Sequence, residues 1–157
     1  NQLHKHKKSG GYIFPLCLPL CAISPSAAVL HRSLLADVGG FDESLPACED
    51  YDLWLRICCK ERVLYVDTPL LMKYGGHEDQ LSKLYWGMDR FRVHSLAKLL
   101  SGASLDAEQE RLVQKTLLEK ATILRNGASK RAKLEDVRYY EQLLKMHGSQ
   151  ISEAHDD

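Results

Sequence analysis

The sequence predicts a mixed α/β fold over residues 1–80, followed by an α-helical extension over residues 81–157. Up to residue 80, the apolar residues come in short runs interrupted by Pro and Gly, as is typical of strands and turns. Beyond residue 80, apolar residues recur every three to four positions, which is the spacing of amphipathic helices. With 157 residues, of which 45% are apolar, the chain is long enough to bury a core.

The first predicted elements lie between residues 12 and 40. Residues 12–23 form the most apolar run, and two prolines divide it. Because Pro cannot donate a backbone hydrogen bond, strands here are short or lie at a sheet edge, and residues 27–30 are the best candidate. The stretch RSLLADVGGF has apolar residues at helical spacing, and Gly39 and Gly40 follow where a left-handed cap would end a helix. In the turn that follows, Asp42 and its acidic neighbour are expected to accept hydrogen bonds from nearby backbone groups.

The next predicted helix covers residues 49–60. Leu53, Trp54, Ile57 and Cys58 fall on one face of it and form an apolar stripe. This helix is expected to pack on the core through that stripe.

The acidic residues of this helix fall on different sides of it. Asp52 shares the opposite face with Arg56 and Lys60 at four-residue steps, so we expect it at the surface. Asp50 lies one turn before the apolar stripe and projects from the N-terminal end of the helix, a position that suits the floor of a pocket.

Strands and further helices follow in order. Residues 63–66 and 70–74 are predicted as two short strands separated by a proline. Three amphipathic helices are then predicted from the positions of their apolar residues and caps, at residues 81–99, 106–127 and 134–144.

Charge and cysteine usage exclude several classes of protein. Basic and acidic residues each number 21, so the chain carries no net charge to attract nucleic acid. The longest apolar run is too short to span a membrane. The five cysteines lack C-x-x-C spacing, which disfavours a zinc site or a disulfide framework and favours buried thiols in a cytoplasmic protein. Because the chain begins with Asn1 and shows no signal pattern, we expect its natural start to lie upstream.

In residues 24–82, several motifs follow one another closely along the chain. They are small residues before an Arg, the turn VGGFDE, the stretch EDYDLWLR, a Pro-Leu strand, and a His with Gln and Ser behind it. This order resembles the second half of the catalytic domain in family 2 glycosyltransferases. The resemblance implies the C-terminal, acceptor-side half of a GT-A (nucleotide-diphospho-sugar transferase) fold in residues 1–80, with a helical extension in 81–157.

The resemblance also implies that part of the catalytic domain is missing. Family members normally carry the donor-nucleotide strands and a D-x-D metal motif before this region. The letters DYD at residues 50–52 lie on the predicted helix and do not correspond to that motif. The resemblance therefore implies a C-terminal fragment of a longer enzyme that is inactive alone.

The reaction implied is an inverting transfer of a sugar from a nucleotide-diphospho-sugar donor to an acceptor hydroxyl. A carboxylate must take the hydroxyl proton, and a divalent metal, Mg2+ or Mn2+, is expected to offset charge on the leaving diphosphate. The resemblance places the general base at Asp50. Without the resemblance, Glu49 and Asp50 are interpreted as first-turn acids whose charge complements the dipole of the helix.

The resemblance also implies roles for further site residues, and some of these residues have a second interpretation. Glu49 either binds an acceptor hydroxyl or only holds the start of the helix. Ser24 and Ser26 are placed in the acceptor pocket. Trp54 is a core residue or offers an edge for sugar stacking. His77 contacts the diphosphate or the metal, or is a polar loop residue that caps the next helix.

A second hypothesis belongs to a different class of function. The helices of residues 81–146 form a non-catalytic interaction module that docks a partner protein or a second copy of the chain. In the first hypothesis the partners are a nucleotide-sugar donor and an acceptor, with no nucleic acid and no transmembrane segment. A cytoplasmic location is expected, and loose membrane association is left open. Neither the donor sugar nor the acceptor follows from the sequence.

Overall fold

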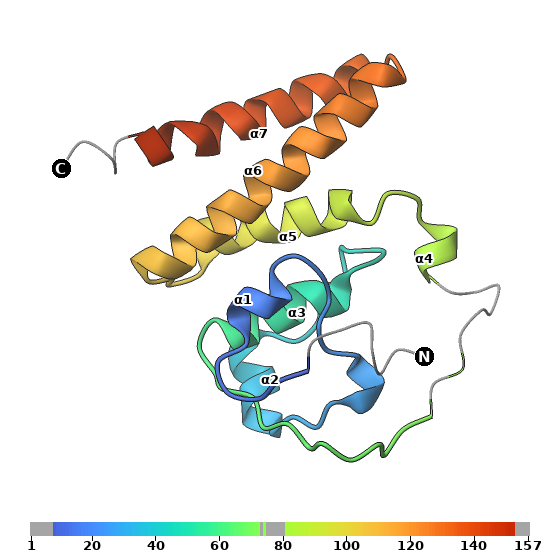
Figure 1. The fold of residues 1–157 in the computed structure, drawn as a ribbon, viewed down its shortest axis with the longest axis vertical. Helices are drawn as coiled ribbons and strands as arrows, with labels where there is room; N and C mark the ends of the chain where they lie inside the picture. The colour runs from blue at the N-terminus through green and yellow to red at the C-terminus, as the bar shows by residue number, and fades with distance from the viewer. Residues whose placement is uncertain (1–7, 73, 75–80, 153–157) are drawn as a thin grey trace. The chain divides into compact units, whose positions relative to one another are not determined.

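The computed structural model describes residues 8–72, 74 and 81–152. The chain divides into two compact units, Asn1–Met88 and Asp89–Asp157. Each unit has its own helices, which Figure 1 shows in order along the chain. We describe each unit by itself.

The prediction of an α/β GT-A fold was wrong. The described residues are mostly helical and contain no β-sheet, only one isolated antiparallel bridge between Gly11 and Val63. Its two backbone hydrogen bonds measure 2.7 and 2.9 Å. An apolar run becomes a strand only when a second strand satisfies its backbone groups. The described part of the chain provides no such partner.

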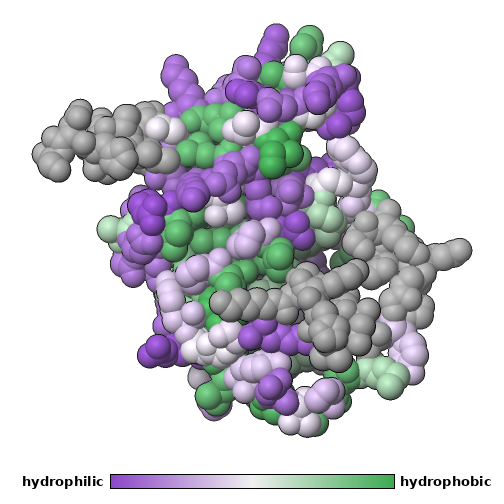
Figure 2. Space-filling model, viewed as in Figure 1, coloured by the Kyte–Doolittle hydropathy of each residue, from purple (hydrophilic) through white to green (hydrophobic). Residues whose placement is uncertain are grey.

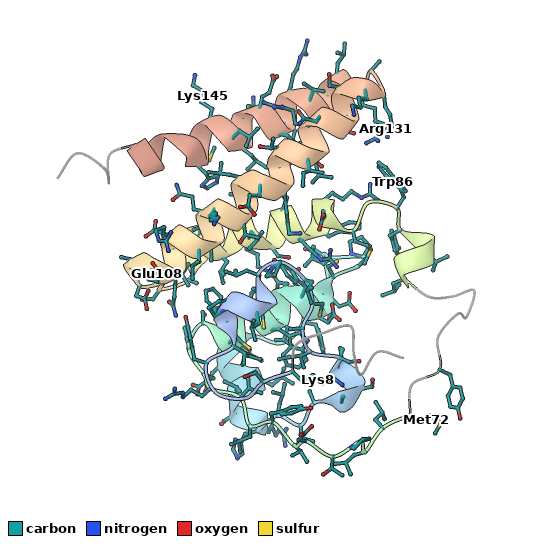
Figure 3. The ribbon with its side chains drawn as sticks, in the orientation of Figure 1. Lys8, Met72, Trp86, Glu108, Arg131 and Lys145 are labelled. Carbon is teal, nitrogen blue, oxygen red and sulfur yellow. The ribbon has the colours of Figure 1, made fainter. Side chains whose placement is uncertain are left out.

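The segments predicted as strands have irregular or 3₁₀ structure instead. Residues 27–30 come at the end of the short 3₁₀ helix η2 (Pro25–Ala27), and Val29 is 99% exposed. The segments 63–66 and 70–72 leave most of their large apolar side chains exposed, among them Met72, labelled in Figure 3. In the first apolar run, proline begins a helix rather than interrupting a strand, since Pro15 lies in the first turn of α1 (Phe14–Cys17).

Helix α3 (Glu49–Cys58) is the centre of the first unit, and α1 and α2 (Arg32–Val38) both pack against it. The predicted helix at residues 49–60 is thereby confirmed, and so is the helix that ends at Gly39. Gly39 adopts a left-handed backbone with φ of 81°, a conformation that costs a glycine little. Seven of the ten residues of α3 are buried, which is typical of a helix enclosed by its neighbours rather than lying on a surface.

The predicted single helix at residues 81–99 is two helices in the structure. They are α4 (Leu81–Leu84), in the first unit, and α5 (Asp89–Gly102), in the second. Gly87 lies between them with a left-handed φ of 73°, a backbone conformation that a continuous right-handed helix does not contain.

The second unit consists of α5, α6 (Ala107–Lys130) and α7 (Leu134–Ser152). Helix α6 contacts both of the others, and α6 and α7 are joined by a short turn, as Figure 1 shows. Asp106 caps α6 as predicted, in a capping box with Gln109. The helix continues past the predicted end at Gly127, because Ala128 is buried in the core. The core also contains apolar residues of all three helices: Val93, Leu96, Leu99, Val113, Leu117, Ala121 and Tyr140.

The outer surface of the second unit is mainly polar. Figure 2 shows hydrophilic side chains over much of the visible face of α6 and α7, with apolar groups between them. In Figure 3, Lys145 on α7 points away from α6. Lys145 lines a shallow surface depression together with Arg138, Glu141 and Gln142, which all belong to α7.

Candidate functional site

Asp50 lies in the first turn of α3 and is half-buried. Both oxygens of its carboxylate accept hydrogen bonds. The thiol of Cys21 donates to Oδ2 over 3.2 Å, and the backbone N–H of Tyr51 donates to Oδ1 over 2.7 Å. The carboxylate is thus held in one orientation while part of the residue stays accessible.

The segment that carries Cys21 is fixed to the start of α3 by a second contact. The Tyr51 hydroxyl donates a 2.6 Å hydrogen bond to the carbonyl of Leu18, and Tyr51 is 1% exposed. Cys21 also packs on the core cluster of α3 that contains Leu53. Two residues of α3, Asp50 and Tyr51, therefore tie residues 18–21 to the N-terminal end of the helix.

Asp52 is buried, with 1% of its surface exposed, so the prediction of a surface position was wrong. It forms an ion pair with Arg56 at 2.8 Å. Arg56 also donates to the carbonyls of Val38 and, over 2.7 Å, of Gly40. The end of α2 and its glycine turn therefore cover the face of α3 that helical spacing assigned to solvent. Asp52 serves this packing and is not available to a substrate.

The turn after Gly40 is held as predicted. Asp42 Oδ1 accepts hydrogen bonds from the backbone N–H and the hydroxyl of Ser44, over 3.0 and 2.6 Å. This is the local side-chain bonding expected of Asp in a turn.

The other acceptor-side candidates lie near the same part of the first unit. Glu49 is half-buried and precedes Asp50 in the first turn of α3. Ser24 and Ser26 flank Pro25 at the start of η2, and their hydroxyls are 3.1 Å apart. Ser24 follows Cys21 by three residues, so the chain places it close to the segment that contacts Asp50.

Trp54 is 3% exposed and lies in a cluster with Leu53 and Ile57. Residues from the segments before and within α2 pack around this cluster: Cys21, Ile23, Ala28, Leu30, Leu34, Leu35 and Val38. The indole Nε1 is buried and has no hydrogen-bond partner. The ring therefore belongs to the core, one of the two roles predicted for it.

The described residues do not supply a metal site. Across residues 8–72, 74 and 81–152, no group of three or more His, Cys, Asp or Glu side chains could hold a metal ion. Asp52 is already paired with Arg56. His77 lies outside the described residues, so its contact with metal or diphosphate stays a prediction. The divalent metal expected for the full-length enzyme, Mg2+ or Mn2+, therefore stays a prediction.

All five cysteines are free thiols, and four of them are buried. A hydrogen bond to Cys17 and burial raise the pKa of the Cys58 thiol, and burial raises the pKa of Cys59. Cys21 differs from the other four because it is only half-buried and contacts a carboxylate. Sequence spacing carried no signal for this contact, since 29 residues separate Cys21 from Asp50.

None of the helices in the described part of the chain combines the length and the apolar character that a membrane span requires.

Comparison with known families gives one match. The model of glycosyltransferase like family 2 matches residues 15–103, which is more than half of the chain. The matched segment contains Cys21, Asp50 and all of α3, and it ends directly after α5. No curated protein and no solved structure matches the chain.

Proposed function

Since the chain belongs to glycosyltransferase like family 2, we propose that it acts in the transfer of a sugar from a nucleotide-diphospho-sugar to an acceptor hydroxyl, with Asp50 as general base. The family supports glycosyltransferase activity in general. Inversion of the anomeric centre and the role of Asp50 are the finer parts of the proposal.

In this reaction the acceptor oxygen attacks the anomeric carbon from the face opposite to the diphosphate. The new C–O bond forms as the bond to the diphosphate oxygen breaks, and the electron pair of that bond leaves with the nucleoside diphosphate. The acceptor proton passes to the carboxylate of Asp50. A base in this role must be ionised and accessible to the hydroxyl.

The observation that supports Asp50 is the contrast with Asp52 on the same helix. Asp52 is buried and neutralised by Arg56. Asp50 is half-buried, forms no ion pair with any described residue, and has both oxygens oriented by donors. Each carboxylate oxygen has two lone pairs, so each keeps one that can meet an acceptor hydroxyl.

Glu49 and Ser24 are proposed to contact the acceptor, and Ser26 is the next candidate. All three belong to the segments around Asp50, namely the first turn of α3 and the start of η2. Trp54 is left out because its ring is buried. A divalent cation at the diphosphate stays an expectation from the family, and no step above passes through it.

Replacing the base tests the proposal directly. Asp50→Asn keeps the size of the side chain and removes its basicity, so transfer should fall by roughly 10²–10⁴-fold. Full-length protein is incubated with UDP-glucose, UDP-N-acetylglucosamine, GDP-mannose and a mixture of sugar and lipid acceptors. Release of nucleoside diphosphate gives the rate, and calorimetry gives the donor affinity, which should not change.

The matched control is Asp37→Asn, which removes an exposed carboxylate from α2 within the same family match. Its rate should stay close to that of the native protein. If Asp50→Asn keeps native turnover, Asp50 is not the base. If donor affinity falls together with the rate, Asp50 contributes to binding rather than to proton transfer.

A further inference from the structure

Cys21 contacts the proposed base from a distant part of the chain, over 3.2 Å to Oδ2 of Asp50. We propose that Cys21 is a positioning residue, whose thiol sets the orientation of the Asp50 carboxylate. This inference rests on the proposed function of Asp50. It assigns Cys21 no contact with substrate.

Cys21 is held by other contacts besides its bond to Asp50. Its side chain packs on the core cluster of α3, and the buried bond from Tyr51 to Leu18 holds the preceding residues against the helix. A donor that is already fixed loses little conformational freedom when it bonds the carboxylate. The thiol is therefore fixed in part by contacts other than the one that it makes with the Asp50 carboxylate.

The thiol has one proton and two acceptors within reach. Besides Asp50 Oδ2, the carbonyl of Ile23 lies 3.3 Å from the sulfur. An ionised carboxylate is the stronger acceptor, so before transfer the proton points to Asp50. The contact thus orients the carboxylate in the state in which it can meet an acceptor hydroxyl.

Removing the hydrogen-bond donor should affect the chemical step and not the binding of the nucleotide-sugar. In Cys21→Ala, kcat should fall about fivefold with unchanged KM for the nucleotide-sugar, because the Asp50 carboxylate is less well oriented.

Two further variants separate positioning from general packing. Cys21→Ser keeps an O–H donor at the same place, so it should restore most of the loss in kcat. Cys59→Ala removes a thiol at the other end of α3, where the sulfur bonds the Arg56 carbonyl, and should leave kcat close to the native value. Equal losses of kcat in Cys21→Ala and Cys21→Ser would show a packing role and overturn the proposal.

A measurement independent of transfer tests the contact itself. Iodoacetamide reacts with the thiolate, and Cys21 is the cysteine that is not buried. Alkylation of Cys21 is followed by peptide mass spectrometry in native protein, Asp50→Asn and Glu49→Gln. Loss of the negative charge beside the thiol should speed alkylation about threefold. Glu49→Gln removes an equal charge from the neighbouring residue and should have a smaller effect.

The two proposals fail in different ways. If Asp50→Asn keeps its turnover, the base assignment is wrong and the positioning role falls with it. If Asp50→Asn loses turnover while Cys21→Ala keeps the native kcat, and Asp50→Asn leaves alkylation unchanged, Asp50 stands as the base and the role of Cys21 is overturned.

Discussion

Asp50 and Asp52 are two positions apart on α3, yet their carboxylates have different surroundings. Asp50 is half-buried and bonded to Cys21, whereas Asp52 is 1% exposed and paired with Arg56 at 2.8 Å. Arg56 extends this pair to the carbonyls at the end of α2. One acid is thus available for chemistry, and the other holds two helices together.

This difference predicts unequal losses of stability from two matched substitutions. Asp52→Asn leaves the charge of Arg56 without its partner in a mostly buried site and should lower the free energy of unfolding by about 2 kcal/mol. Asp50→Asn changes a half-exposed carboxylate with weaker contacts and should lower it by less than about 0.5 kcal/mol. Urea unfolding followed by tryptophan fluorescence measures both. Equal losses in the two variants would contradict the distinct roles of these acids.

Among the elements, α5 and α6 are joined by charge as well as by apolar packing. Asp89, the first residue of α5, accepts a 2.9 Å hydrogen bond from Arg92 on the same helix and another from Lys120 on α6. Burial alone would raise the pKa of Asp89, but the hydrogen bonds from Lys120 and Arg92 outweigh it and lower the pKa below the ordinary value. The ionised carboxylate is therefore favoured in the folded state.

The lowered pKa of Asp89 predicts acid sensitivity of the second unit. A group whose pKa is lower in the folded state stabilises the fold above its unfolded pKa, about 3.9 for Asp, and this contribution is lost as the pH falls through the folded pKa. Asp89→Asn should therefore be less stable than the native protein at pH 7, by about 0.5–1 kcal/mol for a partly exposed pair. The difference should disappear toward pH 2, as measured by thermal melting with far-UV circular dichroism.

The control for Asp89 is Glu108, which forms an exposed ion pair with Arg111 on α6. Hydrogen bonding to Arg111 lowers the pKa of Glu108, but a solvated pair of this kind contributes little to stability. Glu108→Gln should melt at nearly the native temperature at every pH. A pH-independent difference between Asp89→Asn and the native protein would contradict the role of the charge.

At the scale of the whole molecule, the chain forms two compact units. The first is built around α3, and the second around the contacts of α6 with α5 and α7. Both tryptophans, Trp54 and Trp86, belong to the first unit, whereas the three longest helices belong to the second. Fluorescence therefore reports on the first unit, and helical circular dichroism reports mainly on the second.

The division into two compact units predicts separate unfolding transitions. Leu117→Ala removes a fully buried side chain of α6 and should destabilise the second unit by about 2–5 kcal/mol. The transition seen by circular dichroism should move to lower urea, while the fluorescence transition should stay in place. Ile123→Ala, on the same helix at a position that is 65% exposed, should move neither. A joint shift of both transitions would show that the two units unfold as one.

The sequence by itself determined most of the helices. The glycine cap at Gly39, the capping box at Asp106 and the apolar spacing of α3 act within a few residues, so they are visible in the chain. The position of Asp50 at the start of α3 and its choice as the base also came from local pattern and family resemblance.

Features that depend on contacts between residues distant in the sequence were decided only by the tertiary structure. The predicted strands fail because a strand needs a partner strand, and the described residues offer only the bridge between Gly11 and Val63. Asp52 is buried because α2 and its glycine turn lie over it, and helical spacing cannot tell a covered face from a solvated one. The bond between Cys21 and Asp50 joins residues 29 positions apart, so it exists only once the segment before η2 has folded against α3.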